Sequence, residues 1–116
     1  MHIFVYGTLK RDGSNHGYMR GQRFVGEALT APHFRLYDLG GYPGMVADAN
    51  QGLNIQGEVW EVDAEALKRL DELEDIEGGE YAREVIPMLA PYDSTPVEGY
   101  RFLLPVTGYR DIGSTW

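Results

Sequence analysis

The densest group of ionisable side chains in this sequence is a run of carboxylic acids in its second half. Residues 61–80 hold nine of the eighteen acids and two bases, so this segment alone carries a charge of −7. Such a run is usually the solvated face of a helix. A carboxyl that turns away from water instead is a candidate general acid or base, because desolvation raises its pKa.

The acidic run coincides with the clearest helix pattern in the sequence. Residues 63–75, DAEALKRLDELED, have helical apolar spacing, with Asp63 as a plausible N-cap and Gly78-Gly79 as a stop signal. A second, short helix is predicted over residues 15–21. The long helix therefore decides which acids face the interior.

A helical wheel separates one acid from most of its neighbours. At about 100° per residue, one apolar stripe contains Ala66, Leu67, Leu70 and Leu73. Glu74 falls within this stripe, and Glu77 would do so if the helix extended that far, whereas Asp71 lies on its margin. Glu74 is therefore a candidate catalytic carboxyl. The alternative is a boundary residue that reaches solvent or pairs with Arg83.

The second candidate for chemistry is the loop after the first apolar run. Residues 2–6 stop at Gly7 and give way to Thr8, Leu9 and Lys10. A strand that ends in Gly-Thr can leave several successive backbone N–H groups without a ladder partner, and such groups can bind a carboxylate or an oxyanion. The simpler interpretation is that Gly7 only turns the chain.

The sequence lacks the residues for a metal site, a serine nucleophile or a nucleotide-binding loop. There is no cysteine, and the three histidines share no metal-ligand spacing, so no metal site is expected. No GxSxG elbow and no phosphate or dinucleotide loop occurs, and the three serines lie in turn-like contexts. We therefore expect no cofactor.

Composition narrows the class of protein further. A chain of 116 residues with 43% hydrophobic residues fits one domain, residues 1–116, with a real core. The net charge of −8 argues against nucleic acid and anionic membranes as partners. The lack of cysteine suits a reducing compartment, and neither a signal peptide nor a transmembrane run is apparent. We expect a cytoplasmic protein, and its oligomeric state is not readable from the sequence.

Most of the remaining chain reads as short strands separated by Gly-rich turns. Besides residues 2–6, strands are predicted at 33–39, 53–62, 81–89 and 97–104. Pro87 suggests an edge strand or a bulge. The cluster GGYPG is interpreted as a turn, although its Tyr42 could line a pocket. The class is therefore α+β and dominated by a curved sheet or a small barrel.

Taken in order, these segments resemble the gamma-glutamylcyclotransferase-like family, in its small bacterial YtfP-type form. The match runs nearly end to end. It comprises FVYGTLK at the N-terminus, Asn15-His16, YPGMV at 42–46, GEVWEV at 57–62, LDELE at 70–74 and EYAR at 80–83. No single motif is decisive, but the ordered set is specific.

The resemblance implies a small closed β-barrel with flanking helices and a pocket floored by the loop after the first strand. In the family that loop binds the glutamyl group, largely through backbone amides. The substrate-binding positions implied here are Tyr6, Gly7, Thr8 and Leu9, and the family's Tyr-x-Arg maps onto Tyr81 and Arg83. Tyr81 is thus a further expected substrate-binding residue.

The family's essential acid lies in a Leu-Asp-x-apolar-Glu pattern, which maps onto residues 70–74 and selects Glu74. Many members have Gly directly after this Glu, whereas here Asp75 follows Glu74 and it is Glu77 that precedes Gly78. We prefer Glu74, because it lies within the predicted helix and Glu77 lies at its frayed end.

The activity that the resemblance implies is cyclisation of a small γ-glutamyl amide to 5-oxoproline, with release of an amine and with Glu74 as general acid and base. The substrate carries its own nucleophile, so the reaction needs no cofactor or metal. The alternative is a non-catalytic module that binds a small amino-acid-like ligand on the same fold. The leaving amine cannot be read from the sequence.

Overall fold

The first strand is the centre of the fold because both of its faces are buried. The computed structural model describes residues 1–116, and β1 is His2–Val5. Ile3 and Val5 belong to one hydrophobic cluster, and Phe4 and Tyr6 belong to the other. Because successive side chains of a strand point to opposite faces, β1 is covered on both sides, as its apolar run predicts.

The strands pair into two sheets. The five-stranded sheet has the order β2-β5-β1-β7-β6. Its other members are β2 Arg23–Leu29, β5 Gln56–Glu61, β6 Tyr81–Val85 and β7 Val97–Phe102. In it β1 runs antiparallel to β5 and parallel to β7. The three-stranded sheet, in the order β4-β3-β8, comprises β3 Phe34–Asp38, β4 Pro43–Ala47 and β8 Arg110–Gly113.

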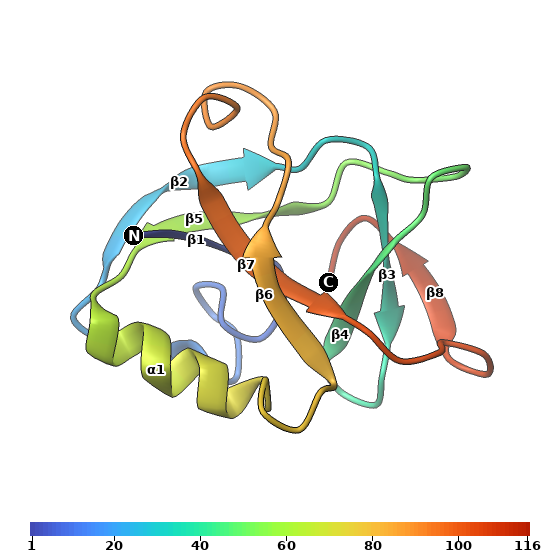
Figure 1. Ribbon diagram of the computed structural model, residues 1–116, viewed down its shortest axis with the longest axis horizontal. Coiled ribbons are helices and arrows are strands. Elements are labelled where there is room, and N and C mark those ends of the chain that lie inside the picture. The colour runs from blue at the N-terminus through green and yellow to red at the C-terminus, as the bar shows by residue number, and fades with distance from the viewer.

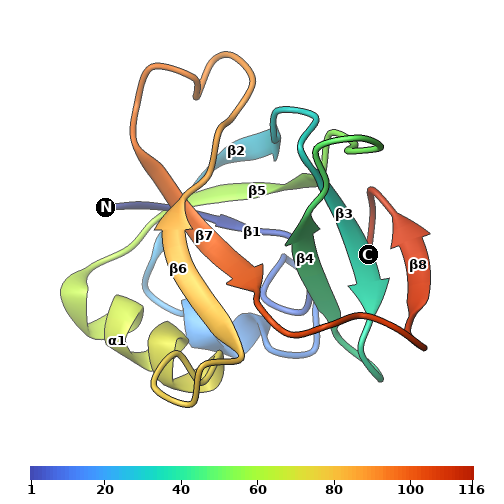
Figure 2. The ribbon, with the colours of Figure 1, turned by 45° about the vertical axis from the view of Figure 1, so that its right-hand side comes forward.

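The two clusters show what covers each face of the large sheet. One cluster includes Ala66 and Leu70 of the helix α1 (Ala64–Leu73) and Met19 of the short 3₁₀ helix η1 (His16–Met19). The other includes Leu36 of β3 and Met45 of β4. Figures 1 and 2 show this arrangement, with α1 at one end of the large sheet and β3, β4 and β8 on the opposite side.

The helix is shorter than the sequence pattern predicts. Asp63 is its N-cap and accepts a hydrogen bond from the backbone N–H of Ala66 at 2.8 Å, as expected. At the other end α1 stops at Leu73, with Glu74 as its C-cap, rather than continuing to residue 75. The reason is Asp75, which adopts the left-handed conformation at φ 52° and ends the helix before the glycines. Glu74 is therefore at the end of the helix and not within it.

The mixed α+β class is confirmed, and all five predicted strands are present with shifted ends. The hydrogen bonds define two sheets and do not join them into one closed ladder, so the closed barrel stays a prediction. Three strands were missing from the sequence analysis: β2, β4 and β8. The cluster at residues 40–44 is a bend only over its first three residues, because Pro43 and Gly44 already pair with β3 and begin β4. The predicted short helix at 15–21 is present as η1.

No helix in the structure is both long enough and apolar enough to cross a membrane.

The loop after β1 passes so close to β4 that it has no room for a side chain at Gly7. A Cβ built on Gly7 would lie 2.5 Å from Cγ and 2.7 Å from Cδ of Pro43. Gly7 thus has a packing requirement of its own, whatever the loop binds.

We expect Gly7→Ala to lower the free energy of unfolding by about 1–3 kcal/mol, because the added methyl group overlaps the Pro43 ring. Gly17→Ala is the matched control, since a Cβ at Gly17 meets nothing within 4 Å. Urea unfolding followed by circular dichroism measures both. A Gly7→Ala protein that is as stable as Gly17→Ala would contradict this packing argument.

Candidate active site

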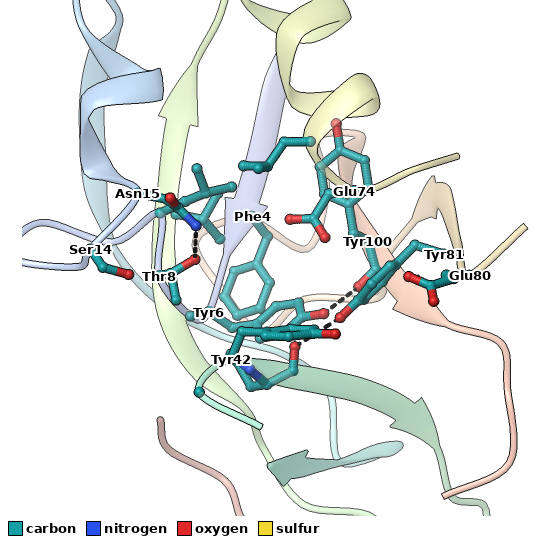
Figure 3. A pocket seen from close by; sticks show the side chains of 16 residues that line it. Phe4, Tyr6, Thr8, Ser14, Asn15, Tyr42, Glu74, Glu80, Tyr81 and Tyr100 are labelled. Atoms are coloured by element: carbon teal, nitrogen blue, oxygen red, sulfur yellow. Dashed lines mark hydrogen bonds between the residues drawn. The ribbon is translucent and has the colours of Figure 1, made fainter. Parts of the chain in front are cut away.

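A cavity of about 270 Å³ lies where β1 ends. Its wall combines segments that are far apart in the sequence. The lining residues are Phe4, Val5, Tyr6, Gly7, Thr8, Leu9, Ser14, Asn15, Gly41, Tyr42, Pro43, Leu73, Glu74, Glu80, Tyr81 and Tyr100. None of them is a lysine, an arginine or a histidine. Figure 3 shows the carboxyl of Glu74 pointing from the end of α1 into the space above the tyrosines.

The carboxyl of Glu74 is the unusual group of this cavity. It is half-buried and has neither a hydrogen-bond donor nor an ion-pair partner in the protein. Desolvation raises its pKa from the ordinary 4.5 to about 7. A carboxyl of this kind exchanges a proton readily near neutral pH, which is the property of a general acid and base.

Arg83, the partner that the sequence offered for Glu74, binds other acids. Arg83 donates from Nε to Oδ1 of Asp71 at 2.9 Å and also pairs with Glu98. Tyr100 donates its hydroxyl proton to the same Asp71 oxygen at 2.7 Å. The alternative interpretation of Glu74, a pair with Arg83, is therefore wrong, and Asp71 takes that role one turn earlier on α1.

The buried tyrosine hydroxyls of the cavity already form hydrogen bonds within the protein. Tyr6 donates to the carbonyl of Tyr100 at 2.7 Å and accepts from the backbone N–H of Met45 at 3.2 Å. Tyr81 donates to the carbonyl of Pro43 at 3.1 Å. Burial raises the pKa of Tyr6 and of Tyr81, and the nearby charge of Glu74 adds to both shifts. These hydroxyls therefore stay neutral and hold the strands together, while Figure 3 shows their rings lining the cavity.

The loop of residues 7–9 offers the cavity free hydrogen-bond donors. The backbone N–H groups of Gly7, Thr8 and Leu9 donate to no acceptor in the protein. The loop closes on itself instead, through Asn15, which donates from its backbone N–H to the carbonyl of Thr8 at 2.9 Å and from Nδ2 to Oγ1 of Thr8 at 3.0 Å. Three successive unpaired N–H groups are suited to an anion.

All six site residues predicted from the sequence line this one cavity: Tyr6, Gly7, Thr8, Leu9, Glu74 and Tyr81. Glu77, the alternative acid, is exposed and lies outside it. Tyr42, a possible pocket residue from its place in the sequence, does line the cavity. Ser14, Glu80 and Tyr100 were missed, because a turn position or a place on a strand gives no sign of facing a cavity.

Known proteins resemble this chain along nearly its whole length. The profile of the family described as "Gamma-glutamyl cyclotransferase, AIG2-like" matches residues 3–115. The chain belongs to the gamma-glutamylcyclotransferase family. It is 37% identical over 114 residues to the gamma-glutamylcyclotransferase family protein YtfP of Escherichia coli K12, covering 98% of this chain and 93% of that protein.

Solved structures of gamma-glutamylcyclotransferase relatives share the fold. The solution structure of E. coli YtfP matches with a TM-score of 0.72 and 38% identity over 98% of this chain and 93% of that one. The crystal structure of an AIG2-like protein from mouse (Mus musculus) matches with a TM-score of 0.81 and 31% identity, covering 99% of this chain and 87% of that one. The chain therefore keeps the family fold across nearly its full length.

The raised pKa of Glu74 predicts a pH-dependent difference in stability. Because burial favours the neutral carboxyl, the folded protein binds this proton more tightly than the unfolded chain does. The stabilising contribution is fully present below the unfolded pKa of about 4.5 and is lost as the pH rises through about 7. We therefore expect Glu74→Gln to gain stability relative to the wild type between about pH 5 and about pH 8.

Thermal unfolding of both proteins across this pH range tests the expectation. Glu77→Gln removes one negative charge from the same segment at an exposed position outside the cavity and is the matched control for the loss of charge. If the difference between Glu74→Gln and the wild type stays constant with pH, Glu74 is not desolvated.

Proposed function

We propose that this chain is an enzyme that cyclises a small γ-glutamyl amide to 5-oxoproline and releases an amine. The observation that carries the proposal is the unpaired carboxyl of Glu74, with its pKa raised to about 7, in the same cavity as the free N–H groups of the loop after β1. Membership of the gamma-glutamylcyclotransferase family supports the same chemistry.

The reaction balances without any group from outside the substrate and the chain. The α-amine of the γ-glutamyl unit attacks the γ-carbonyl carbon, and this new C–N bond closes a five-membered ring. The original amide C–N bond then breaks, and its electron pair leaves with the amine. Holding the chain folded back supplies the proximity that such a ring closure needs.

Glu74 would move the proton in this reaction. The α-ammonium must lose one proton before it can attack and a second once the new C–N bond has formed. The leaving nitrogen takes up both and departs as an ammonium group. A carboxylate with a pKa of about 7 is basic enough to take the first proton and, once protonated, acidic enough to give it to the leaving nitrogen. A well-solvated carboxylate is a much weaker base at neutral pH.

The loop after β1 would bind the anionic part of the reaction. In this proposal, the N–H groups of Gly7, Thr8 and Leu9 donate to the substrate carboxylate or to the oxyanion that develops on the γ-carbonyl. The rings of Tyr6 and Tyr81 shape the pocket around the folded substrate, because their hydroxyls are bonded elsewhere.

The decisive experiment incubates the protein with a panel of γ-glutamyl amines and γ-glutamyl dipeptides and measures 5-oxoproline. Glu74→Gln should lower kcat by at least about 100-fold while the protein stays folded, because Gln keeps the volume but cannot carry the proton. Glu77→Gln is the control and should turn over like the wild type. Normal turnover in Glu74→Gln would refute the assignment, and an inactive Glu77→Gln would transfer the role to Glu77.

The pH profile gives an independent check on the active wild type. We expect kcat/KM to fall as the pH drops, with an apparent pKa near 7, because protonation removes the base. Only this acid limb is diagnostic, since the substrate amine titrates on the alkaline side. Binding of a γ-glutamyl compound without any 5-oxoproline would favour the non-catalytic binding module instead.

A further inference from the structure

Glu58 on β5 is the only charged side chain among the buried residues and is 6% exposed. Its Oε1 accepts from the backbone N–H of Arg11 at 3.0 Å and from the indole N–H of Trp60 at 3.1 Å, and its Oε2 accepts from Nε of Arg11 at 3.0 Å. Burial by itself would raise the pKa of Glu58, but these three donors lower it below its ordinary value. The group is therefore a fixed, buried anion.

The contacts of Glu58 hold the loop of residues 7–15, which forms the floor of the cavity. Arg11 is at the middle of this loop, and its guanidinium lies over the ring of Phe24 on β2, 3.9 Å from the ring centre. The ring of Trp60 packs edge-on against His16, whose Nδ1 lies 3.0 Å from the carbonyl oxygen of Leu9. The loop is thereby fastened to the large sheet at its middle and at its end.

The loop needs such an anchor because three of its backbone N–H groups have no acceptor in the protein. Gly7, Thr8 and Leu9 gain no stability from their own N–H groups. Donors of this kind bind an anion well only when they are already fixed in place, because ordering a flexible loop opposes binding. Glu58 accepts hydrogen bonds from both the backbone and the guanidinium of Arg11, and these bonds restrict the motion of the loop.

We propose that Glu58 is a positioning residue for substrate binding, which fixes the free N–H groups of residues 7–9 by holding Arg11 against β5. The identity of the ligand rests on the proposed function, whereas the anchoring rests on the contacts of Glu58 alone. Glu58 is not expected to touch the substrate, because it does not line the cavity.

Glu58→Gln tests this role. Gln replaces one acceptor oxygen by an N–H₂ group, which faces a donor of Arg11 or Trp60 and breaks at least one bond. We expect KM for a γ-glutamyl substrate to rise about tenfold or more, with a much smaller change in kcat. The acid limb of kcat/KM should stay at the wild-type pH, because Glu74 is unchanged. The matched control is Glu27→Gln, since Glu27 pairs with the same guanidinium at 3.7 Å but is exposed and bonds no backbone group.

A second measurement separates this proposal from the proposed function. In ¹⁵N spectra, the amide signals of Gly7, Thr8 and Leu9 should shift when wild type is titrated with 5-oxoproline. They should also differ between Glu58→Gln and Glu27→Gln without ligand. If the wild type produces no 5-oxoproline from any substrate, the proposed function fails and the ligand-free spectra still decide the anchoring.

Arg11→Gln removes the guanidinium bond to Glu58 by changing the half-exposed partner instead of the buried one. This variant tests the proposal if Glu58→Gln does not fold. It should raise KM and displace the amide signals of Gly7, Thr8 and Leu9 relative to the wild type. A Glu58→Gln protein with the KM and the amide signals of Glu27→Gln would overturn the proposal, and so would a shifted acid limb with an unchanged KM.

Discussion

The cavity depends on the way Asp71 holds the last turn of α1 against the large sheet. Asp71 accepts from Arg83 of β6 and from the hydroxyl of Tyr100 of β7, so the helix end is tied to two strands at once. Asp71 is thus ion-paired on the outer side of the helix end, whereas Glu74, three residues later, lines the cavity without a partner. Desolvation then raises the pKa of Glu74 to about 7.

The sequence could predict Glu74 because a helix has a fixed geometry. A period of about 3.6 residues places this acid beside the leucines whatever the rest of the fold does. The structure bears out that orientation even though Asp75 ends the helix two residues early. The loop was predictable only in part, since a strand that gives way to Gly-Thr can leave backbone N–H groups without a partner but can equally well only turn the chain.

The parts that could not be predicted depend on contacts between distant segments. Strand β4 looks like a turn in isolation, because it begins at Pro43 and contains Gly44, and only its register against β3 makes it a strand. Gly7 looks like a turn residue in the sequence. The reason that a side chain does not fit there is the ring of Pro43, 36 positions later. Glu58 reads as one more acid on a strand, and its burial appears only once Arg11 and Trp60 are in place.

The absence of a cationic side chain from the cavity lining has a physical reason in the proposed reaction. A γ-glutamyl substrate carries a carboxylate, and an arginine is the common way to bind one. Within this small cavity, however, a guanidinium would stabilise the ionised form of Glu74 and lower its pKa, which would weaken it as a base. Backbone N–H groups carry only partial charges and bind an anion with a smaller effect on that pKa. An anion site made of backbone N–H groups can therefore share the cavity with Glu74, whose pKa is about 7. Such a site works only if residues outside the loop hold the N–H groups in place.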